Sequence, residues 1–464
     1  MNIIKKNGRI TSIFIAVITI IFSSNINAFA ADYKSLQTSY QTVTEVFDWG
    51  PAVTKIIINL DRIVPQDSIS NDTFKVHVVR TENRKDTPIL GQSEGDCKVT
   101  KAYVSDENGN YKTKEKYITL ELEVGPDVSL TSPINYDLTT SHNGWLNCDF
   151  TITQQKDIGS GNGKVSGVVI NKFAGGSKKL VDDFKIESAS YDNVTLKYAS
   201  YLPNNDYTKK PLIIWLHGIG EGGVDGLLPI SGNKAVNFIS KDMQSYFNGA
   251  YILAPQAPTY WMDGFTGFGD GTSKYEKALM ALIKDYVSKN SNIDTNRIYI
   301  GGDSNGGYMT MLMIRDYPDY FAAAFPTCEA LENKLITDKD IETFKKIPIW
   351  FTAAKTDTVV PPADYVVPTY NRLVQAGDTN VQFSFFDNVI DTTGAYKKAD
   401  GTPYEYIGHW SWIYVYNNQC SAIINGRVTT LMDWLSKQKL GEINKSQNDI
   451  KPINLSQTIT IASK

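Results

Sequence analysis

The sequence predicts two domains of different fold class, an all-β sandwich followed by an α/β domain with a doubly wound sheet. Three observations lead to this prediction. The first part of the chain consists of short alternating strands separated by turn residues. The second part alternates near-continuous apolar strands with amphipathic helices, which is typical of a parallel sheet covered by helices on both faces. The 464 residues are too many for one ordinary domain and sufficient for two.

Residues 1–30 are predicted to be a secretory signal. They start with a basic stretch that contains Lys5, Lys6 and Arg9, continue with the apolar run SIFIAVITIIF, and end in the cleavage motif Ala28-Phe29-Ala30. A membrane anchor is the alternative, but the apolar run is short for a span. Removal of this segment leaves 43 basic and 50 acidic residues, a net charge of −7. We therefore expect a secreted protein with no nucleic-acid partner and no membrane association after cleavage.

The β-rich domain is assigned to residues 31–175. Its expected strands are VTKIIINL, FKVHVVR, CKVTKAYV, YITLELEV and CDFTITQ. Many short strands joined by turn signals are typical of an antiparallel sandwich of the immunoglobulin-like type. Residues 157–167 are rich in Gly and Ser, so we expect a flexible hinge or loop there, and a domain boundary between it and about residue 185. Cys97 and Cys148 both fall in this domain, and either a disulfide or two isolated thiols fits the sequence.

The α/β domain is assigned to residues 185–441, followed by a polar tail at residues 442–464. The expected strands include PLIIWLHG, GAYILAPQ, RIYIGG, KIPIWFTAAKTD and NVQFSFFDNV. Residues 273–290 follow the pattern of an amphipathic helix, and GRVTTLMDWLSKQ is expected to be a closing helix. This alternation of strand and helix predicts a doubly wound architecture.

Ser304 is the candidate nucleophile because it stands in a Gly-x-Ser-x-Gly pattern with Gly302 and Gly306. A tight turn from a strand into a helix needs residues without side chains on both sides of the Ser. The N-terminus of the following helix then faces the developing negative charge. An ordinary Ser in a glycine-rich loop is the alternative, but the strand before it and the helix after it favour a nucleophile.

The candidate base is found by elimination among four histidines. His77 and His142 lie in the β-rich domain, and His217 precedes Ser304. In doubly wound hydrolases with such a turn the order along the chain is Ser, acid, His. His409 is the one histidine after Ser304, so it is the predicted base. Packing of this side chain among its aromatic neighbours is the alternative.

The candidate acid is Asp357, which ends the strand IPIWFTAAKTD. A carboxylate at the C-terminal end of a parallel strand lies where open α/β sheets build their sites. There it can hold the histidine in the correct tautomer. Asp387, after the next strand, and Asp391, in the loop beyond it, are the alternatives.

The predicted oxyanion hole consists of the backbone amides of Asn305 and Ile219, with Gly220 as the alternative to Ile219. Trp261 and Trp410 are predicted to line the substrate pocket, and for Trp261 a packing role fits the sequence equally well. No metal or organic cofactor is expected, and the chain has no Cys-x-x-Cys motif.

The motifs HGIGEGG, GGDSNGGY, KTDTVVPP and GHWSW, in this order and spacing, resemble the α/β-hydrolase superfamily. They are most similar to secreted bacterial carboxylesterases related to polyester and polyhydroxyalkanoate depolymerases and to the prolyl-oligopeptidase group. Residues 46–61 resemble the start of the immunoglobulin-like domain that some of these esterases carry. The resemblance implies ester hydrolysis by Ser304, Asp357 and His409. One departure is residues 391–406, which look like an inserted hairpin or flap.

The function expected from the sequence is that of an exported serine esterase acting on small or polymeric esters, with short- to medium-chain acyl groups or polyesters as substrates. One alternative is a secreted serine peptidase of the prolyl-oligopeptidase type, because the same triad serves amides. Another is a surface-binding protein with an incidental hydrolase fold. For the N-terminal domain, a role in binding or homo-oligomer formation and a purely structural role both stay open.

Overall fold

Residues 36–161, 163–204, 206–264, 269–442 and 451–453 are described by a computed structural model. The predicted signal at residues 1–30 and most of the predicted tail lie outside these residues. Residues Gln37–Lys464 group into a single unit, and it is this unit whose elements are given below. Among the described residues, no helix combines the length and the apolar character needed to cross a membrane.

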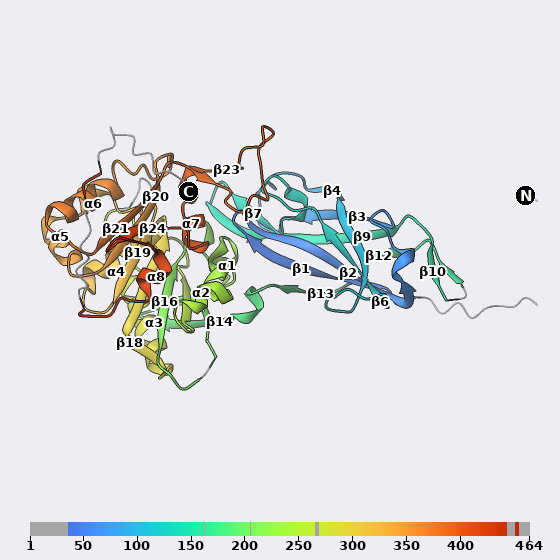
Figure 1. The fold of residues 1–464 in the computed structure, drawn as a ribbon, viewed down its shortest axis with the longest axis horizontal. Helices are drawn as coiled ribbons and strands as arrows, with labels where there is room; N and C mark the ends of the chain where they lie inside the picture. Colours follow the sequence, from blue (N-terminus) through green and yellow to red (C-terminus); the bar gives the residue numbers. More distant parts are fainter. Residues whose placement is uncertain (1–35, 162, 205, 265–268, 443–450, 454–464) are drawn as a thin grey trace, which may run out of the picture. The chain divides into compact units, whose positions relative to one another are not determined.

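Two antiparallel sheets build the N-terminal domain, with one parallel pair at the edge of the first (Figure 1). The first sheet has the order β13 (Phe173–Lys178), β1 (Ser39–Phe47), β2 (Gly50–Pro65), β6 (Lys114–Leu122), β5 (Val99–Ser105). The second has the order β12 (Val169–Ile170), β9 (Asn147–Gln154), β3 (Phe74–Thr81), β4 (Glu94–Cys97). A separate hairpin joins β7 (Ile134–Asp137) to β8 (His142–Trp145). The five strands expected from the sequence are therefore all present.

Alternating residues of the two sheets form the core of this domain, as the period of a strand requires. Ile56 and Ile58 of β2 and Val76 and Val78 of β3 are completely buried. The Tyr40 hydroxyl accepts a hydrogen bond of 3.2 Å from the amide of residue 150, which joins β1 to β9 across the sandwich. Cys97 and Cys148 carry free thiols, as do the other two cysteines.

The predicted hinge at residues 157–167 is instead largely a hairpin, and the domain extends beyond it. β10 (Ile158–Ser160) pairs antiparallel with β11 (Gly163–Val165). The chain then returns as β12 and β13 into the two sheets of the N-terminal domain, so this domain ends at Lys178 rather than at 175. The Gly and Ser residues supply a tight turn, which their composition does not distinguish from a linker.

The α/β domain is built on one eight-stranded sheet. Its order is β14 (Lys185–Tyr191), β15 (Val194–Tyr201), β17 (Tyr251–Gln256), β16 (Lys210–Leu216), β18 (Ile293–Asp303), β19 (Ala323–Thr327), β20 (Ile349–Ala354), β21 (Val381–Phe386). The first two strands are antiparallel to their neighbours, and the six from β17 to β21 run parallel. The C-terminal ends of the parallel strands therefore share one edge, where α/β sheets place their sites.

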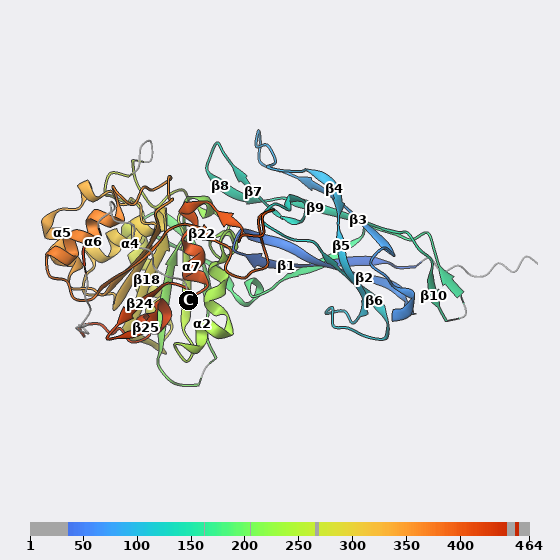
Figure 2. The ribbon, with the colours of Figure 1, turned by 45° about the horizontal axis from the view of Figure 1, so that its top comes forward.

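Helices cover both faces of this sheet (Figures 1 and 2). One face carries α3 (Glu276–Lys289), α4 (Asn305–Asp316), α5 (Asp338–Phe344) and α6 (Val366–Gln375). The other carries α1 (Leu228–Ser231), α2 (Lys241–Ser245), α7 (Trp412–Tyr416) and α8 (Leu431–Leu435). In β16, Leu212 and Ile214 point into the first apolar cluster and Ile213 and Trp215 into the second. Burial on both faces explains why this strand is apolar throughout.

The closing helix is shorter than the sequence predicts. A hairpin of β24 (Ser421–Ile424) and β25 (Arg427–Thr430) takes the first part of the expected segment, and the helix begins only at Leu431. Thr430 caps it, because its side chain accepts a hydrogen bond from the amide of Asp433. The β-branched residues just before this cap fit the strand better than a helix.

Candidate active site

Ser304 lies on the turn between β18 and α4, as expected. Its backbone has φ +53° and ψ −112°, a conformation that costs free energy for a residue with a side chain. Steric contacts explain why glycine stands on both sides of Ser304. A Cβ on Gly302 would lie 2.5 Å from the carbonyl oxygen of Leu216 in β16, and one on Gly306 would lie 1.9 Å from the same atom. The elbow can therefore pack against β16 only when both positions lack a side chain.

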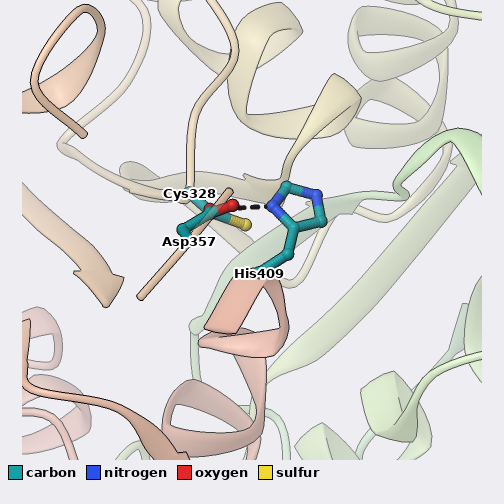
Figure 3. Close-up of side chains that lie close together, drawn as sticks. All are labelled: Cys328, Asp357 and His409. Carbon is teal, nitrogen blue, oxygen red and sulfur yellow. Dashed lines mark hydrogen bonds and ion pairs between the residues drawn. The ribbon is translucent and has the colours of Figure 1, made fainter. Parts of the chain in front are cut away.

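Ser304, His409 and Asp357 are joined by two hydrogen bonds. The Ser304 Oγ lies 2.9 Å from His409 Nε2, and His409 Nδ1 lies 2.8 Å from Asp357 Oδ2. The other carboxylate oxygen accepts hydrogen bonds of 2.9 Å from the amides of Val359 and Val360. Figure 3 shows His409 facing Asp357 with one ring nitrogen. The second ring nitrogen is therefore free to take a proton from the serine.

The two alternative acids have other partners. Asp387 forms an ion pair with Lys355 at 2.5 Å. Asp391 accepts hydrogen bonds from Thr393 and from the amide of Tyr396 in its own loop. That loop joins β22 (Val389–Ile390) to β23 (Glu405–Tyr406), so the expected insertion is a hairpin.

The two loops predicted to form the oxyanion hole both reach the same cavity as Ser304. Asn305 is the first residue of α4, so its amide is among those that the helix leaves without an internal partner. The side-chain oxygen of Asn305 accepts a hydrogen bond of 2.7 Å from the amide of Trp261. Ile219 begins the short helix η4 (Ile219–Glu221), and both Ile219 and Gly220 line the cavity.

A cavity of about 1100 Å³ opens at Ser304 and His409. Trp410 is among the residues that line it. Trp261 lies elsewhere, because its side chain is completely buried and contacts His217 and Tyr275. Its role is packing, which was the alternative interpretation. Much of the remaining wall comes from the N-terminal domain, including Trp49, Leu90, Ile134, Tyr136, Leu138 and Asn143.

Cys328, just after β19, lies beside Asp357 and His409 (Figure 3). One ligand-type atom of each residue lies within 4.8 Å of the others. These donors do not suit a metal, because Asp357 and His409 are bonded to each other and His409 also to Ser304. Burial further raises the pKa of the Cys328 thiol well above its usual value, which disfavours the thiolate that a metal needs.

Sequence reasoning missed three features of the site. It gave no role to Cys328, to the wall contributed by the N-terminal domain, or to Glu221 and Asp303, two buried acids close to Ser304. Of these residues, only Glu221 could have been singled out from the sequence, because it is an acid between glycines in HGIGEGG. The wall could not be predicted, because the contacts join residues far apart in the chain.

Two family profiles match the chain. One, described as an esterase Ig-like N-terminal domain, matches residues 39–167. The other, the prolyl oligopeptidase family, matches residues 276–383. A solved structure described as a thermostable esterase superposes with a TM-score of 0.70 at 27% identity, covering 86% of this chain and 99% of that one.

Several curated relatives match parts of the chain. Feruloyl esterase B of Neurospora crassa is 28% identical over 28% of this chain and 42% of that protein. Poly(3-hydroxyalkanoate) depolymerase C of Paucimonas lemoignei is 25% identical over 45% of this chain and 55% of that protein. The matched region thus spans about half the length of these relatives. The sheet order, the two profiles and the structural neighbour agree. The chain is a member of the α/β-hydrolase superfamily that carries an N-terminal immunoglobulin-like domain of the esterase type.

Proposed function

We propose that the chain is an exported serine esterase that hydrolyses carboxylic esters through an acyl-enzyme. The observation that carries this proposal is the hydrogen-bonded series Ser304, His409, Asp357, with distances of 2.9 and 2.8 Å. The names of the matched relatives and of the structural neighbour support ester hydrolysis. Export rests on the predicted signal at residues 1–30.

Ser304 Oγ attacks the ester carbonyl while His409 Nε2 takes its proton. Asp357 stabilises the resulting imidazolium and holds the ring in the required tautomer. The amides of Asn305 and Ile219 donate hydrogen bonds to the oxyanion of the tetrahedral intermediate. His409 returns the proton to the leaving alcohol. Water activated by the same histidine then releases the acid and regenerates Ser304.

The proposed substrates carry short- to medium-chain acyl groups, and polyesters belong to the range. The cavity of about 1100 Å³ is larger than an acetyl ester needs. Apolar side chains stand exposed at its wall, among them Leu138, Ile407 and Val359. Such a wall favours esters with an extended apolar part.

The proposal is tested with residues 31–464 on p-nitrophenyl acetate, butyrate, octanoate and palmitate, beside Ser304→Ala. We expect turnover in the parent protein and a loss of at least about 10⁴-fold in kcat in the variant. An unchanged rate in Ser304→Ala would contradict the assignment of the nucleophile. Absence of turnover on every ester would contradict the proposed function.

A serine peptidase is the second candidate, and the match of residues 276–383 to the prolyl oligopeptidase family favours it. An ester and an amide with the same acyl group distinguish the two functions. The proposed esterase has the higher kcat/KM on the ester after correction for the uncatalysed rates. A higher corrected value on the amide would favour the peptidase.

A further inference from the structure

Glu221 and Asp303 are two buried acids that connect the two halves of the predicted oxyanion hole. Glu221 ends η4, which begins at Ile219, and Asp303 directly precedes Ser304. Both carboxyl groups converge on Gly218. A Cβ there would lie 2.6 Å from Asp303 Oδ2 and 3.4 Å from Glu221 Oε2. The position of the loop relative to the nucleophile therefore depends on this pair.

Two neighbouring buried carboxyl groups cannot both be ionised at little cost, so the pair keeps a proton at neutral pH. Burial raises the pKa of Glu221 to about 7. Burial, and then the charge of Glu221, raise the pKa of Asp303 well above its usual value. A pair that retains one proton avoids the repulsion between two adjacent anions, so both carboxyl groups can stay close to Gly218.

The second oxygen of Glu221 is bound by the N-terminal domain. Asn143, on β8, donates a hydrogen bond of 2.9 Å from Nδ2 to Glu221 Oε1. The loop has no side chain where β8 meets it. A Cβ on Gly220 would lie 2.8 Å from Asn143 Nδ2, and one on Gly222 would lie 2.8 Å from His142 Nε2. The glycines therefore allow β8 to pack directly on the loop.

The same hairpin is fixed to the α/β domain by a second set of contacts. The ring of His142 stacks on that of Tyr260, with centroids 4.9 Å apart. The Tyr260 hydroxyl donates a hydrogen bond of 2.6 Å to the carbonyl oxygen of Thr140. These contacts hold β8 against the loop. The Asn143 side chain is thereby kept in position to bind Glu221.

We propose that Asn143 is a positioning residue that acts from the immunoglobulin-like domain: through Glu221 and Asp303 it holds the oxyanion loop in register with Ser304. This inference rests on the proposed esterase function and assigns the N-terminal domain a part in the chemical step. Asn143 touches no reacting atom. Its removal lowers kcat by misplacing the loop, and it leaves substrate binding nearly unchanged.

The groups that face the acid pair keep one charge state from neutral to alkaline pH. Burial raises the pKa values of Tyr416 on α7 and of Cys328 well above their usual values. Burial lowers the pKa of His217 to about 4 and also lowers that of His142. Above neutral pH the acid pair is therefore the group near the loop that loses a proton.

The test compares Asn143→Ala with Asn147→Ala, which removes an exposed amide at the start of β9 in the same domain. With p-nitrophenyl butyrate, we expect Asn143→Ala to lower kcat by about 10- to 100-fold and to change KM by less than about 3-fold. We expect Asn147→Ala to match the parent protein. Parent-like kcat in Asn143→Ala, or an equal loss in Asn147→Ala, would overturn the proposal.

Two further variants keep the test decisive if Asn143→Ala does not fold. Asn143→Asp keeps the shape but lacks the donor, so its kcat relative to the parent should decline as the pH rises and Glu221 loses its proton. In the parent protein, loss of the pair's proton above neutral pH should lower kcat, because two adjacent anions repel. Glu221→Gln cannot form two adjacent anions, so this alkaline fall in kcat should be absent from that variant. Parent-like pH profiles in both variants would overturn the proposal. Failure of the parent protein itself to hydrolyse any ester would instead mark failure of the proposed function.

Discussion

At the scale of single residues, the two carboxylate oxygens of Asp357 have different hydrogen-bond partners. Oδ1 accepts hydrogen bonds from the amides of Val359 and Val360, which fix the carboxylate, while Oδ2 faces His409. The backbone thus orients the carboxylate, and the carboxylate orients the imidazole ring. An isosteric amide would keep the first set of bonds and place an NH₂ group against the histidine.

Asp357→Asn is therefore expected to lower kcat by about 10⁴-fold with little change in folding, because His409 is held in the wrong tautomer. Asp387→Asn is the control, since that side chain is exposed and pairs with Lys355. Steady-state kinetics on p-nitrophenyl butyrate and thermal unfolding measure the two effects. A greater loss of kcat in Asp387→Asn than in Asp357→Asn would assign the role of the acid to Asp387.

At the scale of elements, the elbow depends on the close approach of α4 to β16. Gly306 lies inside a helix, where Gly normally costs about 0.5–1 kcal/mol relative to Ala. Here the helix gains from the missing side chain, because its backbone packs against the carbonyl group of Leu216. Strand, turn and helix are thus fixed together, which holds Ser304 in its unusual conformation.

Gly306→Ala should consequently destabilise the fold by about 1–3 kcal/mol or more, against the usual helix preference. Gly159→Ala in β10 is the matched control, because a Cβ there meets only the side chain of Ser68 at 3.9 Å. Denaturant unfolding followed by circular dichroism measures both variants. Equal stability of Gly306→Ala and the parent protein would contradict the close packing of the elbow.

At the scale of the whole unit, the immunoglobulin-like domain contributes a wall of the cavity at Ser304. Leu138, between β7 and β8, is 68% exposed and faces this cavity. An exposed apolar side chain at a site can bind the apolar part of a substrate without a folding penalty. The domain thereby adds apolar surface to that of Ile407 and Val359 in the α/β domain.

Leu138→Ser is expected to lower kcat/KM for the octanoate ester about 3- to 10-fold and to leave the acetate ester nearly unchanged, because only the longer chain reaches the wall. Ile423→Ser is the control, since Ile423 is 69% exposed on β24 and does not line the cavity. The ratio of kcat/KM values for the two esters measures the effect. An equal ratio in both variants would show that the wall takes no part in selectivity.

The hydrogen-bonded arrangement of Ser304, His409 and Asp357 could be predicted from the sequence because its parts are local signals. Gly302 and Gly306 mark the elbow, and Asp357 follows a strand. His409 remained after elimination. The contact between Asn143 and Glu221 could not be predicted, because 77 residues lie between them and two domains must fold before they meet. Composition also could not distinguish the hairpin at residues 157–167 from a linker, since both need Gly and Ser.

Trp261 illustrates the same limit at the scale of one side chain. Its position after a strand suits a pocket wall, but the depth at which a loop lies depends on tertiary packing. The side chain of Asn305 accepts a hydrogen bond from the backbone amide of Trp261 and so holds this loop. The indole ring of Trp261 packs in the apolar core.

The most direct test of the central claim is covalent labelling with a p-nitrophenyl alkylphosphonate, followed by mass spectrometry of the peptides. The phosphonate is attacked as an ester would be and leaves a stable adduct on the nucleophile. We predict one adduct per chain, on the peptide that contains Ser304, and its absence in Ser304→Ala. An adduct on another residue, or no adduct in a protein that hydrolyses esters, would contradict the assignment of Ser304 as nucleophile.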